Sequence, residues 1–127
     1  MSKPSSNIFS IITAFLPSVL WAGFIYYLSS QSVLPSLMLS SWDFVFKKSA
    51  HIIVYAILYL LLFHAFRQTV PLKGSAVWLV PLAFAIAYAA FDEVHQSYVS
   101  GRHGALKDVG FDTLGCSLVI MRKFGYI

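Results

Sequence analysis

The feature that most constrains the fold is an uncharged apolar run from Ile8 to Leu28. Its 21 residues would span about 31 Å as a helix, which is enough to cross the hydrocarbon core of a bilayer. Only 11% of the whole chain is charged and 58% is hydrophobic, whereas a soluble domain carries about 25% charged residues. We therefore expect a membrane protein, and 127 residues leave room for one domain.

Three further apolar runs follow. We predict membrane spans at about 8–28, 49–66, 75–91 and 106–121, which gives an all-α protein with four transmembrane helices in a single domain over residues 1–127. The fourth run has the weakest signal because it is short and carries Asp112. The first is interpreted as a retained span, because its apolar core is too long for a cleaved signal peptide and Lys3 is the one basic residue before it.

Four spans would place both termini and the 67–74 loop on one side of the membrane. That side would carry five Lys and Arg residues and the other side four, so the positive-inside rule predicts cytoplasmic termini. The second side would also hold all five acidic residues. The polar segments between the spans are therefore expected at the outer face.

Four of the five acids fall between residues 91 and 113, and helical spacing predicts which polar groups share a face. Side chains three or four residues apart are neighbours on a helix. Ionisable groups at membrane depth are costly and normally face the bundle interior. We expect three helix ends to converge and enclose a polar pocket formed by Lys48, His51, Tyr55, Glu93, Gln96, Arg102, Asp108 and Asp112.

The sequence resembles the VanZ-like family of small bacterial membrane proteins. The resemblance rests on Lys48, His51, Tyr55 and Leu58 at their spacing, on "DEVHQSYVSGRHGALKDVGFDTLG" at 92–115, and on "YLSSQS" at 27–32. Its best-specified part is the order of Glu93, Gln96, Arg102 and Asp108, with Gly101 before the arginine. The resemblance implies a multi-pass protein of the bacterial cytoplasmic membrane, and the namesake of the family is linked to teicoplanin resistance. It implies no particular biochemical activity.

Two positions depart from the family pattern. The family often has Asp where this chain has Lys47, and Asn where this chain has Asp112. The additional carboxylate either pairs with a cation, such as Lys48 or Arg102, or has a raised pKa and stays protonated.

The first functional hypothesis is a ligand-binding site for a lipid headgroup. Arg102 offers a planar fork for phosphate or carboxylate, and Lys48 a mobile point charge. The expected partners are membrane lipids, a lipid-linked cell-wall precursor or the lipid tail of teicoplanin. Binding would change susceptibility to lipophilic glycopeptides without a covalent step.

Two alternatives remain open. The protein could be an enzyme acting on a lipid-linked phosphate or glycan, with His51 and Glu93 as acid and base, although no nucleophile motif is present. The polar residues could instead form a purely structural ion network. A metal site from His51, Glu93, His95 and His103 is disfavoured because Glu93 and His95 are two residues apart and point away from each other.

Other partners and cofactors are not expected. No basic stripe with interleaved aromatic residues is present, so nucleic acid is a poor candidate partner. The single Cys116 excludes an internal disulfide and a cysteine-pair zinc site. We predict neither a metal nor an organic cofactor.

Overall fold

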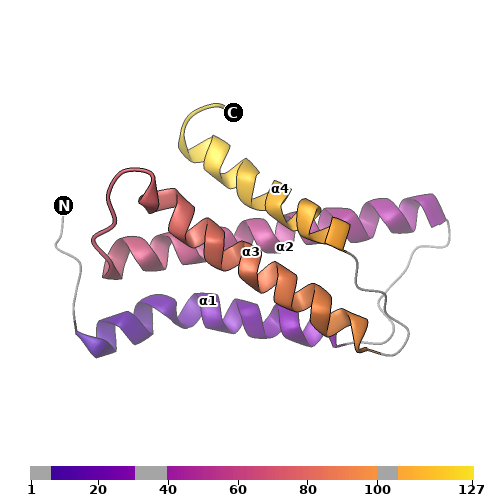
Figure 1. Cartoon of the computed structure of the whole chain (residues 1–127), viewed down its shortest axis with the longest axis horizontal. Helices are drawn as coiled ribbons and strands as arrows, with labels where there is room; N and C mark the ends of the chain where they lie inside the picture. The colour runs from indigo at the N-terminus through magenta and orange to yellow at the C-terminus, as the bar shows by residue number, and fades with distance from the viewer. Residues whose placement is uncertain (1–6, 31–39, 100–105) are drawn as a thin grey trace.

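The computed structural model describes residues 7–30, 40–99 and 106–127, and these residues form four helices that alternate in direction (Figure 1). They are α1 (Ile8–Ser29), α2 (Ser40–Thr69), α3 (Ala76–Ser97) and α4 (Leu106–Lys123). The all-helical class is confirmed. Three segments are long and apolar enough to cross a membrane, namely Ile8–Ser29, Phe44–Thr69 and Ala76–Ser97. Helix α4 is not among them.

Two helices are longer than the apolar runs that predicted them. Helix α2 begins at Ser40 rather than near Ser49, and α3 continues past Phe91 to Ser97. Hydropathy marks the part of a helix that matches the lipid, whereas the backbone hydrogen-bond ladder continues into polar sequence. These polar extensions of α2 and α3 carry Lys48, Glu93 and Gln96, so the longer helices place those side chains rigidly.

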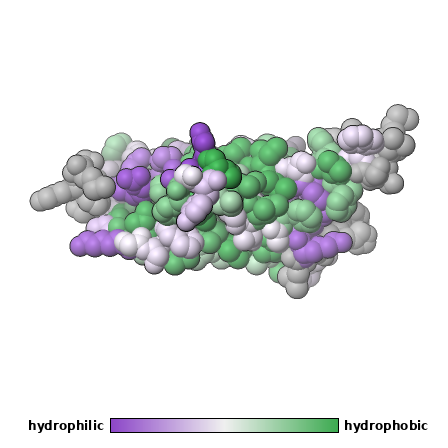
Figure 2. Space-filling view, turned by 90° about the horizontal axis from the view of Figure 1, so that it is seen from above, coloured by the Kyte–Doolittle hydropathy of each residue, from purple (hydrophilic) through white to green (hydrophobic). Residues whose placement is uncertain are grey.

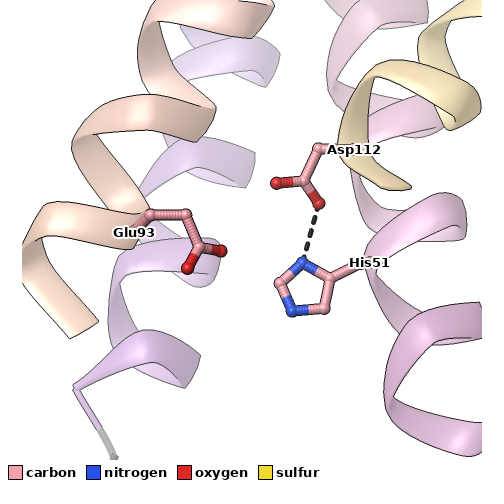
Figure 3. Close-up of side chains that lie close together, drawn as sticks. All are labelled: His51, Glu93 and Asp112. Carbon is pink, nitrogen blue, oxygen red and sulfur yellow. Dashed lines mark hydrogen bonds and ion pairs between the residues drawn. The ribbon is translucent and has the colours of Figure 1, made fainter. Parts of the chain in front are cut away.

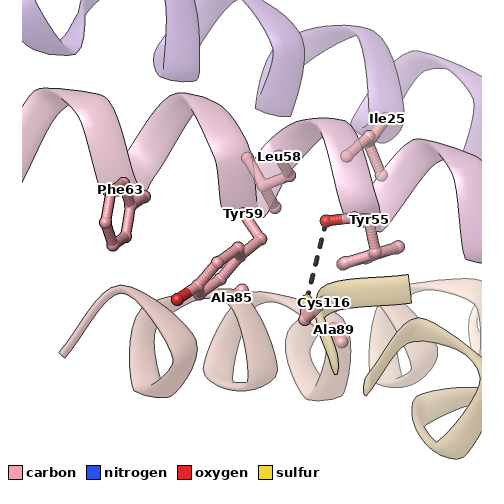
Figure 4. Packing of buried hydrophobic residues seen from close by; sticks show 8 residues of the cluster. All are labelled: Ile25, Tyr55, Leu58, Tyr59, Phe63, Ala85, Ala89 and Cys116. Carbon is pink, nitrogen blue, oxygen red and sulfur yellow. Dashed lines mark hydrogen bonds between the residues drawn. The ribbon is translucent and has the colours of Figure 1, made fainter. Parts of the chain in front are cut away.

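Helix α2 is the centre of the bundle, because it packs against α1, α3 and α4. It supplies the large core residues Tyr55, Leu58, Tyr59 and Phe63 (Figure 4). The other helices present smaller groups to them: Ile25, Ala85, Ala89 and Cys116. Large side chains on one helix and small ones on its neighbours allow close approach without cavities.

Helices α2 and α4 approach each other closely where Gly115 meets Ile52. A Cβ atom at Gly115 would overlap the backbone oxygen of Ile52, so only glycine fits there. One residue further along α4, the Cys116 thiol donates to the Tyr55 carbonyl at 3.6 Å. This contact fixes the register in which the first half of α4 lies along the first half of α2.

The outer surface of the bundle is strongly apolar. Hydrophobic residues cover most of the face seen in Figure 2, and hydrophilic residues form small separate patches. On α1, Phe9 is 71% exposed and Leu20 is 65% exposed. A soluble monomer rarely exposes apolar area on this scale, so the surface is suited to lipid. Near the start of α2, Trp42, Phe44 and Phe46 are also exposed, as residues at a membrane boundary would be.

Candidate functional site

Buried polar side chains gather at one end of the bundle, where the ends of α1 and α3 meet the first halves of α2 and α4. Each of them is at most 6% exposed, and they are Asp92, Glu93, Gln96, Asp108 and Asp112. Burying a charge is costly unless it is paired, hydrogen-bonded or bound to a metal. The partners of these groups therefore decide what the cluster can do.

The innermost pair joins α2 to α4. His51 Nδ1 lies 2.7 Å from Asp112 Oδ1, and Asp112 is 1% exposed. The second oxygen, Oδ2, is buried and has no hydrogen-bond partner among the residues that the structure describes. Asp112 thus meets His51 and not Lys48, which pairs with Asp108, and Arg102 lies outside the described residues.

Glu93 faces the same pair from α3. In Figure 3 its carboxylate points from the opposite side toward His51 and Asp112. One ligand-type atom from each of the three residues lies within 4.8 Å of the other two. Each residue comes from a different helix, so the packing of α2, α3 and α4 creates this group of three.

A second ion pair lies one helical turn nearer the start of both helices. The Lys48 amino group of α2 pairs with the Asp108 carboxylate of α4, and their side chains are 16% and 9% exposed. The same amino group lies 5.5 Å from the centre of the Phe44 ring and 5.4 Å from that of Phe111. Aromatic faces attract a cation in this position. Lys48 is thus held at the rim of the cluster.

A third group binds α2 to α3. The Tyr55 hydroxyl donates to Asp92 Oδ2 at 3.1 Å, and the Gln96 amide donates to the same oxygen at 3.3 Å. Asp92 was not predicted as a site residue, although its spacing from Gln96 placed the two on one face. It is buried and accepts one hydrogen bond from α2 and one from its own helix, so it links α3 to α2.

His95 lies on the other side of α3. Its Nδ1 is 2.8 Å from the Ser29 hydroxyl, and its ring stacks on Tyr26 with 4.4 Å between ring centres. It therefore faces α1, whereas Glu93 faces α2 and α4. The prediction that Glu93 and His95 point away from each other is confirmed.

Seven of the eight predicted site residues lie in the described part of the chain, in three adjoining groups. Lys48 pairs with Asp108, His51 and Glu93 gather with Asp112, and Tyr55 and Gln96 meet at Asp92. Arg102 and His103 lie outside the described residues. A separate shallow hollow lies toward the other end of the bundle and is lined by residues that include Phe63, Arg67, Trp78 and Lys123.

The charge balance of the cluster is uneven. Among the described residues it holds four carboxylates, on Asp92, Glu93, Asp108 and Asp112, against one lysine and one histidine. Like charges that are buried close together repel one another, so the partners of these carboxylates matter for the stability of this end of the bundle.

Three apolar helices around a buried polar cluster define a small multi-pass membrane protein. Residues 2–122 match the VanZ/LLP1 family, and the chain belongs to that family. The resemblance seen in the sequence is thereby confirmed. A search of curated proteins and a search of solved structures give no match.

Proposed function

We propose that this protein is an envelope protein of the bacterial cytoplasmic membrane that binds the phosphate-bearing headgroup of a lipid or lipid-linked wall component. Binding would modify susceptibility to lipophilic glycopeptides such as teicoplanin. Membership of the VanZ/LLP1 family supports an envelope role of this kind. The observation that carries the proposal is the convergence of ionisable side chains from three helices inside an apolar bundle, because such groups are costly in lipid and usually serve a function.

Lys48 is the described residue best placed to meet a headgroup. Its amino group is at the rim, partly exposed, and held between two aromatic rings and Asp108. A preorganised ammonium group at the level where Phe44 and Phe46 are exposed would attract a phosphate without reorganising first. From the sequence, Arg102 would supply a second donor, with a fork that matches two phosphate oxygens.

The proposed topology has four spans with cytoplasmic termini, so that the polar cluster opens at the outer face. Helix α4 is too polar to count as a span by composition alone, yet it packs along α2, which shields its polar side from lipid. The opposite end of the bundle carries Arg67, Lys73, Arg122 and Lys123, which supports a cytoplasmic position for that end.

Drug susceptibility at matched membrane abundance tests the proposal. Lys48→Met, Glu93→Gln and Arg102→Ala should each lower protection against teicoplanin by about tenfold, which corresponds to about 1.4 kcal/mol of lost binding. Lys73→Met is the matched control, because it removes an exposed lysine from the other end of the bundle. None of the four variants should change susceptibility to a glycopeptide without an acyl chain.

The proposal fails if Lys48→Met, Glu93→Gln and Arg102→Ala all protect as the unaltered protein does at equal abundance. It also fails if Lys73→Met loses as much protection as they do. Loss of protein from the membrane in the site variants, with protection retained per molecule, would instead favour a purely structural network.

A further inference from the structure

Three potential metal ligands converge at the centre of the polar cluster. His51, Glu93 and Asp112 offer one nitrogen and two carboxylate oxygens, and these atoms lie within 4.8 Å of one another. Ligands bound tetrahedrally at about 2.1 Å from a metal are about 3.4 Å apart, so small rotations of side chains would complete the geometry. His51 Nδ1 and Asp112 Oδ1 are 2.7 Å apart, so a metal would replace the proton of their hydrogen bond and move the two atoms slightly apart.

Asp112 supplies an independent indication of a missing partner. It is 1% exposed, and its Oδ2 atom has no hydrogen bond to any residue in the described ranges. A buried carboxylate oxygen left in this way is destabilising unless something binds it. In Figure 3 the Asp112 carboxylate lies above the His51 ring, and its oxygen that is not bonded to His51 points toward the side from which Glu93 approaches.

We propose that His51, Glu93 and Asp112 bind one divalent transition-metal cation. Imidazole favours zinc, iron and related ions, and carboxylates favour manganese, so the mixed set suits cations of this group. The three ligands come from three helices: His51 from α2, Glu93 from α3 and Asp112 from α4. The ion would therefore hold these helices together. Three protein ligands leave at least one coordination position open.

The ion would also correct the charge balance of the cluster. Two positive charges would offset two of the four carboxylates, and the open coordination position would give an anion a direct bond to the metal. Binding of a phosphate oxygen at the open coordination position rests on the proposed function. Metal binding itself does not rest on it, because the test uses metal alone.

Metal content of the purified protein provides the test. The full chain in detergent micelles, stripped with a chelator, would be dialysed against Zn²⁺ and, separately, against Mn²⁺, and bound metal measured. We expect saturable binding of one ion per chain. X-ray absorption of the zinc form should show nitrogen and oxygen ligands at about 2.0–2.1 Å and no sulfur at about 2.3 Å, since Cys116 is not a ligand.

Isosteric variants locate the ion. Asp112→Asn and Glu93→Gln should weaken binding by roughly 100-fold or more, because each removes a charged ligand. Asp92→Asn is the matched control: it removes a neighbouring buried carboxylate that is engaged by Tyr55 and Gln96, and binding should persist. If Asp112→Asn does not fold, Glu93→Gln on a different helix decides by the same measurement.

Absence of saturable binding would overturn the proposal. So would a zinc site with a sulfur ligand, or an equal loss of binding in Asp92→Asn and Asp112→Asn. Susceptibility to teicoplanin is measured separately, so loss of metal binding and loss of the proposed function can be told apart.

Discussion

His51 Nδ1 lies 2.7 Å from Asp112 Oδ1 and links α2 to α4 inside the bundle. Neither residue could be buried alone at low cost, because a lone carboxylate or a lone imidazole in an apolar setting lacks hydrogen-bond partners. The pair belongs to a wider polar cluster formed by side chains of α2, α3 and α4. Stability and function at this end of the bundle should therefore respond together to substitution.

The His51–Asp112 hydrogen bond can be tested without metal. In chelator-treated protein, Asp112→Ala leaves His51 without its described partner and should lower the free energy of unfolding by about 1–3 kcal/mol. Asp112→Asn keeps an oxygen acceptor and should cost less. Thermal unfolding in detergent, followed by circular dichroism, compares the two. An equal cost for both variants would show that the hydrogen bond is not what matters.

Gly115 should be intolerant of any side chain. Gly115→Ala would place a methyl group against the Ile52 carbonyl and force α2 and α4 apart, at a cost of about 1–3 kcal/mol. Gly110→Ala is the matched control on the same helix, because open space surrounds that position. It should be neutral or stabilise the helix by up to about 1 kcal/mol. Unfolding midpoints that fall equally would contradict the close helix contact.

The Lys48–Asp108 pair should show strong coupling between its members. Removing one partner, by Lys48→Met or Asp108→Asn, leaves the other poorly compensated at the edge of the apolar bundle. The double variant removes that penalty and should be more stable than the sum of the single effects implies, by about 1 kcal/mol or more. A double-mutant cycle on unfolding free energies measures this, and simple additivity would show that the two groups do not interact.

Two buried tyrosines allow a hydrogen bond to a carboxylate to be compared with a hydrogen bond to the backbone. Tyr55 donates to the Asp92 carboxylate, and Tyr59 donates to the Trp78 carbonyl, both at 3.1 Å. Hydrogen bonds to charged groups contribute about 1.5–3 kcal/mol, against about 1 kcal/mol for neutral pairs. Tyr55→Phe should therefore destabilise the protein more than Tyr59→Phe. The reverse order in thermal unfolding would contradict this ranking of the two hydrogen bonds.

Much of the helical architecture could be predicted from sequence because long apolar runs have few structural solutions. The face shared by Lys48, His51 and Tyr55 also follows from spacing within one helix. The helix ends could not be predicted, because the apolar runs end at the lipid boundary whereas α2 and α3 continue into polar sequence.

The pairing between helices could not be predicted, for a different physical reason. Asp108 and Asp112 are one helical turn apart, so Lys48 could have met either of them. The choice depends on the register of α4 against α2, which is fixed where Gly115 meets Ile52. Spacing along one helix carries no information on that register. The place of Asp112 in the group with Glu93 therefore emerged only from the fold.

Solid-state NMR in lipid bilayers tests the central claim most directly, namely that side chains from separate helices meet within the membrane-embedded bundle. Dipolar recoupling between ¹⁵N-labelled histidine and ¹³C-labelled aspartate carboxyls, with His51→Ala to assign the signal, reports the distance from His51 to Asp112. A hydrogen bond between the two predicts a separation of about 3.5–4 Å between Nδ1 and the carboxyl carbon. A His51 ring with no carboxyl carbon within about 6 Å would contradict the gathering of these residues and everything proposed for them.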